Sequence, residues 1–198
     1  MKFKIFIALF SASLISCISG DDYSNQAIKD VKADPSKQKE IKPGDTLDIH
    51  NGVVVYYNGG VFHGDHWVGD YKLGQKYQCV EYVKRYYYQH LKHKMPNMWG
   101  HAVNFYNKSL SDGMYNSDRG LKQFSNPSLQ KPRPDDLLVY DLGDSYGHVS
   151  IVSKVDDNTI EVVQQNWGST SRSTFAISQT GGKWKIDSPL VLGWLRKE

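Results

Sequence analysis

Cysteine is scarce in this chain, because only Cys17 and Cys79 occur among its 198 residues. Since Cys17 falls in a short N-terminal segment typical of export, the remaining domain holds a single thiol and cannot form an intramolecular disulfide. A strong excess of one charge is also lacking, since 24 Lys and Arg residues stand against 21 Asp and Glu residues. With no basic stripe and no zinc-finger spacing, this balance argues against a nucleic-acid-binding protein.

Long hydrophobic runs are absent apart from residues 5–15, which follow two lysines. This run is too short for a permanent membrane span and is typical of a signal peptide. It ends in Leu14-Ile15-Ser16-Cys17, which resembles a bacterial lipobox. We therefore expect a signal peptide with a lipobox over residues 1–17, lipidation of Cys17, and an exported lipoprotein that is membrane-anchored and faces the periplasm or the cell exterior. The alternative is an ordinary secretory signal in which Cys17 is incidental.

Two further regions follow the export segment. Residues 18–45 are polar and charged, which predicts a tether between the lipid anchor and the domain. Residues 46–198 are long enough to form one domain with a hydrophobic core. The chain contains 13 Tyr and 5 Trp residues, an aromatic content that suits a folded surface for sugars or peptides.

Cys79 opens a predicted helix that extends to about residue 92. Four apolar side chains recur there at helical spacing: Val80, Val83, Tyr87 and Leu91. Lys84 and Arg85 are predicted to lie off this apolar face. A thiol at a helix N-terminus meets unpaired backbone N–H groups and the positive end of the helix dipole, which favour the nucleophilic thiolate. The alternative is that Cys79 is a small buried side chain that only packs.

The remaining elements are predicted from hydrophobic alternation and turn residues. We expect a short strand within residues 51–60, a second helix over about residues 99–110, and mostly loop over residues 111–134. Strands are then expected at residues 136–141, 148–155, 159–165, 181–187 and 191–196, the second and third of them joined as an antiparallel hairpin. Because helices precede strands in this reading, the expected fold class is α+β, with N-terminal helices packed on an antiparallel sheet.

His148 is the strongest candidate for a catalytic base among the seven histidines. It opens the most apolar predicted strand, where a sheet can fix its backbone, whereas the other histidines fall in loop or helix contexts. Imidazole can take the proton of a cysteine thiol and later return it to a leaving amine. Strand alternation is expected to place Gln164 and Asn166 on one face of the partner strand, where either amide could reach the imidazole, with Gln165 on the other face.

Three motifs in this order resemble the CHAP family, the cysteine, histidine-dependent amidohydrolases/peptidases, and are most similar to the amidase domains of glutathionylspermidine synthetase/amidase enzymes. The motifs are Gln78-Cys79-Val80-Glu81-Tyr82-Val83, Gly147-His148-Val149-Ser150-Ile151-Val152 and Val163-Gln164-Gln165-Asn166-Trp167. The resemblance covers roughly residues 50–197. It implies a papain-like α+β fold and hydrolysis of amide bonds by a Cys–His pair.

The same resemblance implies a role for each matching residue. Cys79 would be the nucleophile, and His148 would act as base and acid. Gln164 occupies the position where related domains often carry a glutamate, and a neutral amide can still orient the imidazole, as asparagine does in papain-like proteases. Asn166 could share or take over that role. No cofactor is implied.

Paired histidines suggest a competing zinc site, at His63 and His66 around Asp65 and at His90 and His93. Their spacing matches no established zinc motif, so we expect no metal. Four aromatic side chains are candidates either for a substrate groove or for ordinary packing: Trp67, Tyr71, Trp99 and Trp167.

Three functions compete on this evidence. The first is an exported hydrolase that cuts amide bonds in peptidoglycan, either between sugar and stem peptide or within the peptides. The second is a small-molecule amidase for a glutathionylspermidine-like conjugate, which the export segment argues against because that conjugate is a cytoplasmic metabolite. The third is a catalytically weakened cell-wall-binding module. The expected partners are peptidoglycan or a peptide substrate and a membrane bound through the lipid anchor, with no nucleic acid and a monomeric protein.

Overall fold

The computed structural model describes residues 40–198. The predicted signal peptide, Cys17 and most of the predicted tether lie outside the described residues. Within residues 40–198, no helix combines the length and the apolar character needed to cross a membrane.

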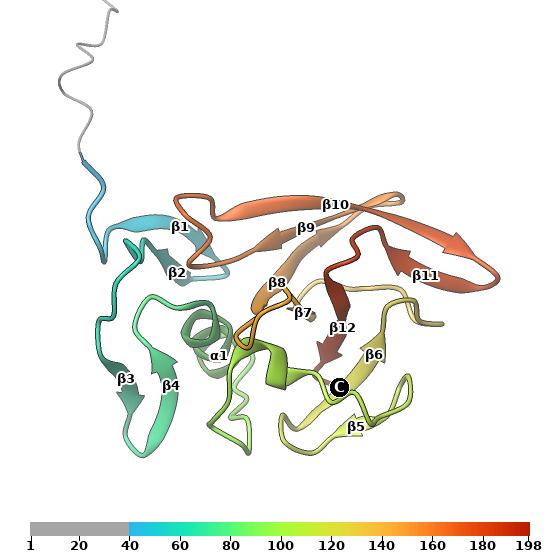
Figure 1. Ribbon diagram of the computed structural model, residues 1–198, viewed down its shortest axis with the longest axis horizontal. Helices are drawn as coiled ribbons and strands as arrows, with labels where there is room; N and C mark the ends of the chain where they lie inside the picture. The colour runs from blue at the N-terminus through green and yellow to red at the C-terminus, as the bar shows by residue number, and fades with distance from the viewer. Residues whose placement is uncertain (1–39) are drawn as a thin grey trace, which may run out of the picture. The chain divides into compact units, whose positions relative to one another are not determined.

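An eight-stranded antiparallel sheet forms the centre of the domain (Figure 1). Its strands lie in the order β11-β10-β9-β8-β7-β12-β6-β5. Their bounds are β5 (Tyr115–Asn116), β6 (Leu121–Ser125), β7 (Leu137–Tyr140), β8 (His148–Val155), β9 (Thr159–Val163), β10 (Arg172–Thr180), β11 (Lys183–Ile186) and β12 (Val191–Arg196). The predicted strands at residues 148–155 and 191–196 are confirmed, and so is the antiparallel β8–β9 hairpin.

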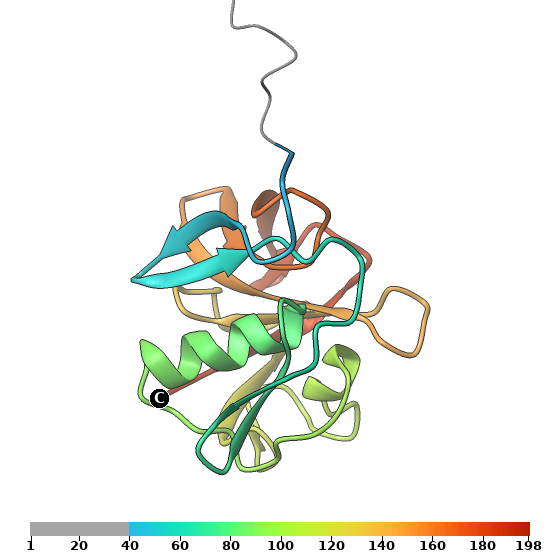
Figure 2. The same cartoon turned by 90° about the vertical axis from the view of Figure 1, so that its left-hand side faces the viewer.

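Two hairpins and one α-helix complete the domain. The hairpins are β1 (Thr46–His50) with β2 (Val53–Tyr56), and β3 (Asp65–Val68) with β4 (Tyr71–Gln75). The helix is α1 (Cys79–Gln89), followed by a 3-10 turn, η2 (Ala102–Phe105). Figure 2 shows α1 lengthwise, with the β1–β2 hairpin on one side of it. The domain therefore has mixed content and is mostly β.

The core has two parts, one on each face of the sheet. On the α1 face, Tyr82 and Val83 of the helix pack with Val149 and Ile151 of β8. On the other face, the core contains Val152 of β8 together with residues of the neighbouring strands, among them Leu138, Val162 and Trp194. Successive residues of β8 thus point to opposite faces, as a strand requires.

Two expectations about the fold are wrong. Helices do not precede strands, because the four short strands β1 to β4 come before α1. The helix expected over residues 99–110 is reduced to the single turn η2, whose first residues are capped by the Asn104 side chain accepting from the His101 backbone N–H at 2.8 Å. The segment 111–134 is mostly loop, as expected, with the short strands β5 and β6 within it, and the strand β10 was not predicted.

Lys84 and Arg85, which were predicted to lie off the apolar face of α1, are both buried. Lys84 donates through Nζ to the carbonyl oxygens of Lys72 and Met98. Arg85 donates through Nε to Glu81 Oε1 at 2.6 Å. Long cationic side chains can be buried in this way when carbonyl and carboxylate oxygens take up their protons. The helix is therefore enclosed on more than its apolar face.

Candidate active site

Cys79 is the first residue of α1 and is only 8% exposed. The preceding residue, Gln78, is extended and accepts the first helical hydrogen bond from the Tyr82 N–H at 3.1 Å. The end of β4 runs close beneath this first turn. Gly74 there has φ +141°, and a Cβ atom at this position would lie 3.1 Å from the Glu81 backbone nitrogen. The glycine thus allows the strand to approach the helix that carries the thiol.

His148 is the first residue of β8 and is 4% exposed. The turn before it is held by Asp144, whose Oδ1 accepts from the backbone N–H groups of Tyr146 and Gly147 at 2.9 and 2.7 Å. Gly147 has φ +65°, and a Cβ atom there would lie 2.5 Å from the Tyr140 carbonyl oxygen. Only glycine fits this turn without displacing the backbone, which explains the Gly147-His148 pair in the sequence.

Gln164 contacts the imidazole directly. Its Oε1 lies 3.0 Å from His148 Nε2, while its Nε2 donates to Ser173 Oγ at 2.8 Å. Because an amide oxygen only accepts hydrogen bonds, this contact places the imidazole proton on Nε2. The neutral ring then presents Nδ1 as the nitrogen that can accept a proton. The Trp167 ring packs over His148, with the ring centroids 4.8 Å apart.

Asn166 does not share this role in the structure. The strand β9 ends at Val163, and Asn166 has φ +61°, so the alternation expected for residues 164 and 166 does not extend that far. The Asn166 side chain instead donates from Nδ2 to Gln78 Oε1 at 2.5 Å. The two amides that were equivalent candidates in the sequence therefore contact different residues, His148 and Gln78.

Burial dominates the ionisation of both candidate catalytic groups. It raises the pKa of the Cys79 thiol to about 11, although backbone N–H groups of Val149 and Val80 favour the thiolate. Burial also lowers the pKa of His148 to about 4, and the contact with Gln164 offsets only part of this shift. The resting pair at neutral pH is therefore a thiol and a neutral imidazole. The helix N-terminus alone does not produce the thiolate that its position in the sequence suggested.

Cys79 and His148 line one cavity of about 610 Å³. Gln78, Asn166 and Trp167 also line it, and so do Lys72, Trp99, His101 and Tyr146. None of the described residues that line this cavity is Asp or Glu. The arrangement can therefore bring a nucleophile, a base and amide donors to one bound molecule that is neutral or anionic.

Gln165, between the two amides, was not predicted to act at the site and has the most contacts of the three. Its Nε2 donates to Glu81 Oε2 at 2.9 Å and to the Gln78 carbonyl oxygen at 3.0 Å. Its Oε1 accepts from the Tyr56 backbone N–H at 2.8 Å. The side chain thereby joins β2, the end of β9 and the start of α1. These contacts differ from those of Gln164, which contacts His148 and Ser173.

Glu81 is the buried charge at the centre of this network. Burial alone would raise its pKa, but hydrogen bonding from His66 and the charge of Arg85 hold the pKa of the carboxyl below its usual range. His66 Nδ1 lies 2.8 Å from Glu81 Oε1. A buried carboxylate with three partners stays ionised and fixes the first turn of α1.

The histidines considered for a zinc site have other contacts. His66 contacts Glu81, and His63 Nε2 lies 2.6 Å from the Asn58 carbonyl oxygen. Among residues 40–198, no group of three or more His, Cys, Asp or Glu side chains is arranged to hold a metal ion.

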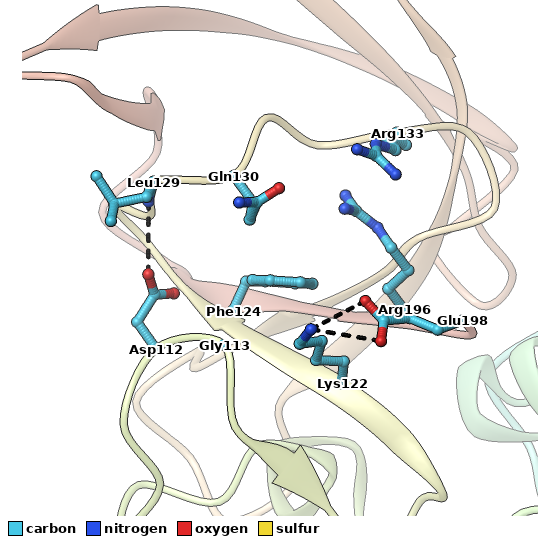
Figure 3. A pocket seen from close by; sticks show the side chains of 9 residues that line it. All are labelled: Asp112, Gly113, Lys122, Phe124, Leu129, Gln130, Arg133, Arg196 and Glu198. Atoms are coloured by element: carbon cyan, nitrogen blue, oxygen red, sulfur yellow. Dashed lines mark hydrogen bonds and ion pairs between the residues drawn. The ribbon is translucent and has the colours of Figure 1, made fainter.

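A separate cavity of about 340 Å³ lies over β6 and β12 (Figure 3). Charged side chains dominate its lining, including Lys122 paired with Glu198, and Arg196, which is held by Asp136 at 2.7 Å. Neither Cys79 nor His148 lines it. It is therefore distinct from the candidate active site.

The fold and site define a mostly β domain in which a helix-borne cysteine and a strand-borne histidine share a cavity. The family model of the CHAP domain matches residues 70–166, a range that includes Cys79, His148 and Gln164. The resemblance to the CHAP family identified from the three motifs is therefore confirmed over these residues. The match supports a hydrolase that acts on amide bonds.

Two curated relatives illustrate the match. Trypanothione synthetase of Crithidia fasciculata is 26% identical over 150 residues, which cover 68% of this chain and 23% of the relative. The bifunctional glutathionylspermidine synthetase/amidase of Escherichia coli (strain K12) is 25% identical over 114 residues, which cover 56% of this chain and 18% of the relative. The chain thus spans less than a quarter of the length of these relatives. Among solved structures, the crystal structure of Ly7917 is 15% identical, with a TM-score of 0.35, and the match covers 61% of this chain and 53% of that one.

Proposed function

We propose that this protein is an exported cysteine amidohydrolase or peptidase that hydrolyses amide bonds in peptidoglycan. The observation that carries the proposal is the shared cavity of Cys79 and His148, with Gln164 fixed on the far nitrogen of the imidazole. This arrangement is also what a papain-like fold provides, with the nucleophile at a helix start and the base on a sheet. The match to the CHAP domain supports the general activity.

The first half of the reaction forms a thioester. The Cys79 proton passes to His148 Nδ1 as Sγ attacks the carbonyl carbon of the substrate amide, which gives a tetrahedral oxyanion. His148 then returns the proton to the leaving nitrogen, the C–N bond breaks, and the amine departs. Because the resting pair is neutral, the proton moves only when the substrate is in place. Gln164 keeps the imidazole in the tautomer that leaves Nδ1 free.

Gln78 is the side chain best placed to stabilise the oxyanion. Its Oε1 is occupied by Asn166 Nδ2, so its own Nε2 donor is directed away from that contact, in a cavity that Gln78 lines. The backbone N–H of Cys79, at the start of α1, is a second donor that needs no partner within the helix. Two such donors aimed at the oxyanion are the usual means of stabilising a tetrahedral intermediate. Asn166 therefore acts as a positioning residue for Gln78.

The second half of the reaction hydrolyses the thioester. His148 Nδ1 takes a proton from a water molecule as its oxygen attacks the thioester carbon. The same proton then reaches Sγ as the C–S bond breaks, so the free acid leaves and Cys79 is again a thiol. The sum of both halves is one amide and one water converted to one acid and one amine.

The cavity lining favours cell-wall material over a polyamine conjugate. A spermidine-like leaving group carries several positive charges, yet no described residue lining the cavity is acidic, and Lys72 contributes a positive charge. Trp99 is exposed in the same lining and packs against exposed Trp67, with Lys72 Nζ 4.6 Å from the Trp99 ring centroid. Exposed aromatic faces beside a cation suit sugar rings and carboxylates. Peptidoglycan offers both.

Export supports the same substrate. The predicted lipobox at Cys17 would place the domain outside the cytoplasm, where peptidoglycan is present, at the end of a tether. A glutathionylspermidine-like amidase remains the second candidate, because the curated relatives include a glutathionylspermidine synthetase/amidase. A catalytically weakened wall-binding module is the third, motivated by a neutral Gln164 in place of a glutamate.

One experiment separates these functions. Purified peptidoglycan is digested with the wild-type protein and with Cys79→Ala, and the soluble products are analysed by mass spectrometry. New amine and acid ends with the wild type alone support the proposal, and their masses identify the bond. Cleavage of glutathionylspermidine but not of peptidoglycan would select the second candidate. Binding to peptidoglycan without cleavage of any amide would select the third.

A further inference from the structure

A second cavity, of about 290 Å³, adjoins the active-site cavity on the other side of the catalytic imidazole. The two cavities share three lining residues: Leu142, His148 and Trp167. The second cavity extends over the sheet face opposite α1, where the strands β7 and β10 contribute Tyr140 and Phe175. The two cavities therefore meet at the catalytic imidazole.

The chemistry determines which part of a substrate lies there. The acyl carbon must sit at Cys79 Sγ, and the leaving nitrogen must sit where His148 can give it a proton. The residue that carries this nitrogen therefore begins beside the imidazole. We propose that the second cavity is the subsite for that residue and accepts an uncharged, apolar side chain on the amine side of the cleaved bond. This inference rests on the proposed cysteine amidohydrolase activity.

The side chains that line the second cavity explain why it would select an apolar side chain over a charged one. Apolar and aromatic side chains make up half of the ten lining residues: Tyr140, Leu142, Trp167, Phe175 and Leu190. The polar groups at its base already have partners, since the Tyr140 hydroxyl pairs with Ser150 at 2.8 Å and Ser173 accepts from Gln164. No described residue that lines it is charged, apart from the titratable His148. A charged side chain would lose water there without gaining a partner.

Leu190 offers a direct test, because it lines the cavity and is 43% exposed, so that it tolerates replacement. Leu190→Glu places a carboxylate in the subsite. The matched control is Leu129→Glu, at a leucine that is 63% exposed in the separate cavity of Figure 3. Both variants add the same charge to the protein, but only one adds it beside His148.

Binding is measured first, without any need for turnover. Leucinamide and lysinamide, which mimic the amine product, are titrated into the full chain while the indole N–H signal of Trp167 is followed by NMR. The signal is assigned with Trp167→Phe. We expect leucinamide to shift it at least fivefold more than lysinamide at equal concentration, the preference to reverse in Leu190→Glu, and Leu129→Glu to match the wild type. Equal responses to both ligands, no response to either, or a preference that Leu190→Glu leaves unchanged would overturn the subsite.

Turnover gives a second measurement. For peptides that differ only in the residue on the amine side of the cleaved bond, leucine should give at least a tenfold higher kcat/KM than lysine, and Leu190→Glu should invert this ratio. A wild type that cleaves the lysine peptide as well as the leucine peptide would overturn the subsite. If no peptide or peptidoglycan bond is cut, the proposed function fails, while the NMR titration still decides whether the cavity binds apolar amines.

Discussion

The Nε2 atom of His148 lies 3.0 Å from the Oε1 atom of Gln164, so that a neutral amide, and not a carboxylate, holds the imidazole. Gln164 is itself fixed by Ser173 at 2.8 Å and is buried. The amide can hold the tautomer but cannot stabilise a positive charge on the ring. This difference has a measurable consequence for the pH dependence of the enzyme.

Replacing Gln164 by glutamate should raise the pKa of His148, because a carboxylate stabilises the imidazolium. The base must be neutral to accept the Cys79 proton, so the acid limb of the kcat/KM profile should move to higher pH. Activity near neutral pH should be kept or improved. Gln164→Ala should instead lower kcat about 10- to 100-fold, since the ring loses its orientation. Asn166→Ala should cost less than Gln164→Ala, and the reverse order would show that Asn166 orients the base.

Replacing Cys79 by alanine should abolish turnover while leaving the fold intact. Loss of a nucleophile removes several orders of magnitude in rate, whereas alanine is well tolerated at the start of a helix. Turnover is followed with peptidoglycan, and the fold by circular dichroism and thermal unfolding. Activity within about tenfold of the wild type would rule out Cys79 as the nucleophile.

The neutral resting pair predicts how Cys79 reacts with iodoacetamide. Because burial raises the thiol pKa to about 11, the thiolate fraction should grow about tenfold for each pH unit between pH 6 and 9. The alkylation rate, measured on the peptide that carries Cys79 by mass spectrometry, should follow this slope without a plateau. A plateau at or below pH 7 would indicate a preformed thiolate–imidazolium pair.

Gly147→Ala should destabilise the protein and inactivate it. The residue has φ +65°, and the new Cβ would meet the Tyr140 carbonyl at 2.5 Å, so the turn before His148 must shift. We expect a loss of at least about 2 kcal/mol in the free energy of unfolding, measured in urea. Gly143→Ala is the matched control, because Gly143 also has positive φ but its Cβ would meet nothing within 4 Å. Equal losses for both variants would show that the close approach at Gly147 is unimportant.

Cys17→Ser should release the protein from membranes, because serine cannot carry the thioether-linked lipid. The soluble and membrane fractions of cells that express wild type and variant are compared by immunoblotting. A variant that stays in the membrane fraction would favour a plain signal peptide or another anchor.

The strand β8 and the helix α1 could be predicted because their sequence patterns are unambiguous. The strand His148–Val155 is a long apolar run, and the helix that begins at Cys79 repeats apolar residues at helical spacing. The strand Asp65–Val68 could not be predicted in this way, because it is short and none of its side chains is buried. The strand Leu121–Ser125 could not be predicted either, because the residues around it are rich in Gly, Asn and Ser, a composition typical of loops.

The candidate catalytic residues could also be predicted from local sequence patterns, whereas the contacts around them could not. Cys79, His148 and Gln164 stand in motifs that recur within a family, and the structure brings Cys79 and His148 to one cavity, with Gln164 on the imidazole. The roles of these residues stay predictions until they are tested. The contact between Asn166 and Gln78 depends on a backbone turn after the strand end, which no alternation rule describes. The burial that raises the thiol pKa depends on packing around the helix start, which a local motif does not contain.

Three consecutive residues, Gln164, Gln165 and Asn166, connect three different parts of the site. The first holds the base, the second holds the helix that carries the nucleophile, and the third holds the amide preceding that nucleophile. A shift of one residue in this segment would displace all three side chains from these partners at once, because the three residues are consecutive. Evolution can therefore vary the chemistry of each side chain separately, as at Gln164, but an insertion or deletion here would dismantle the whole site in a single step.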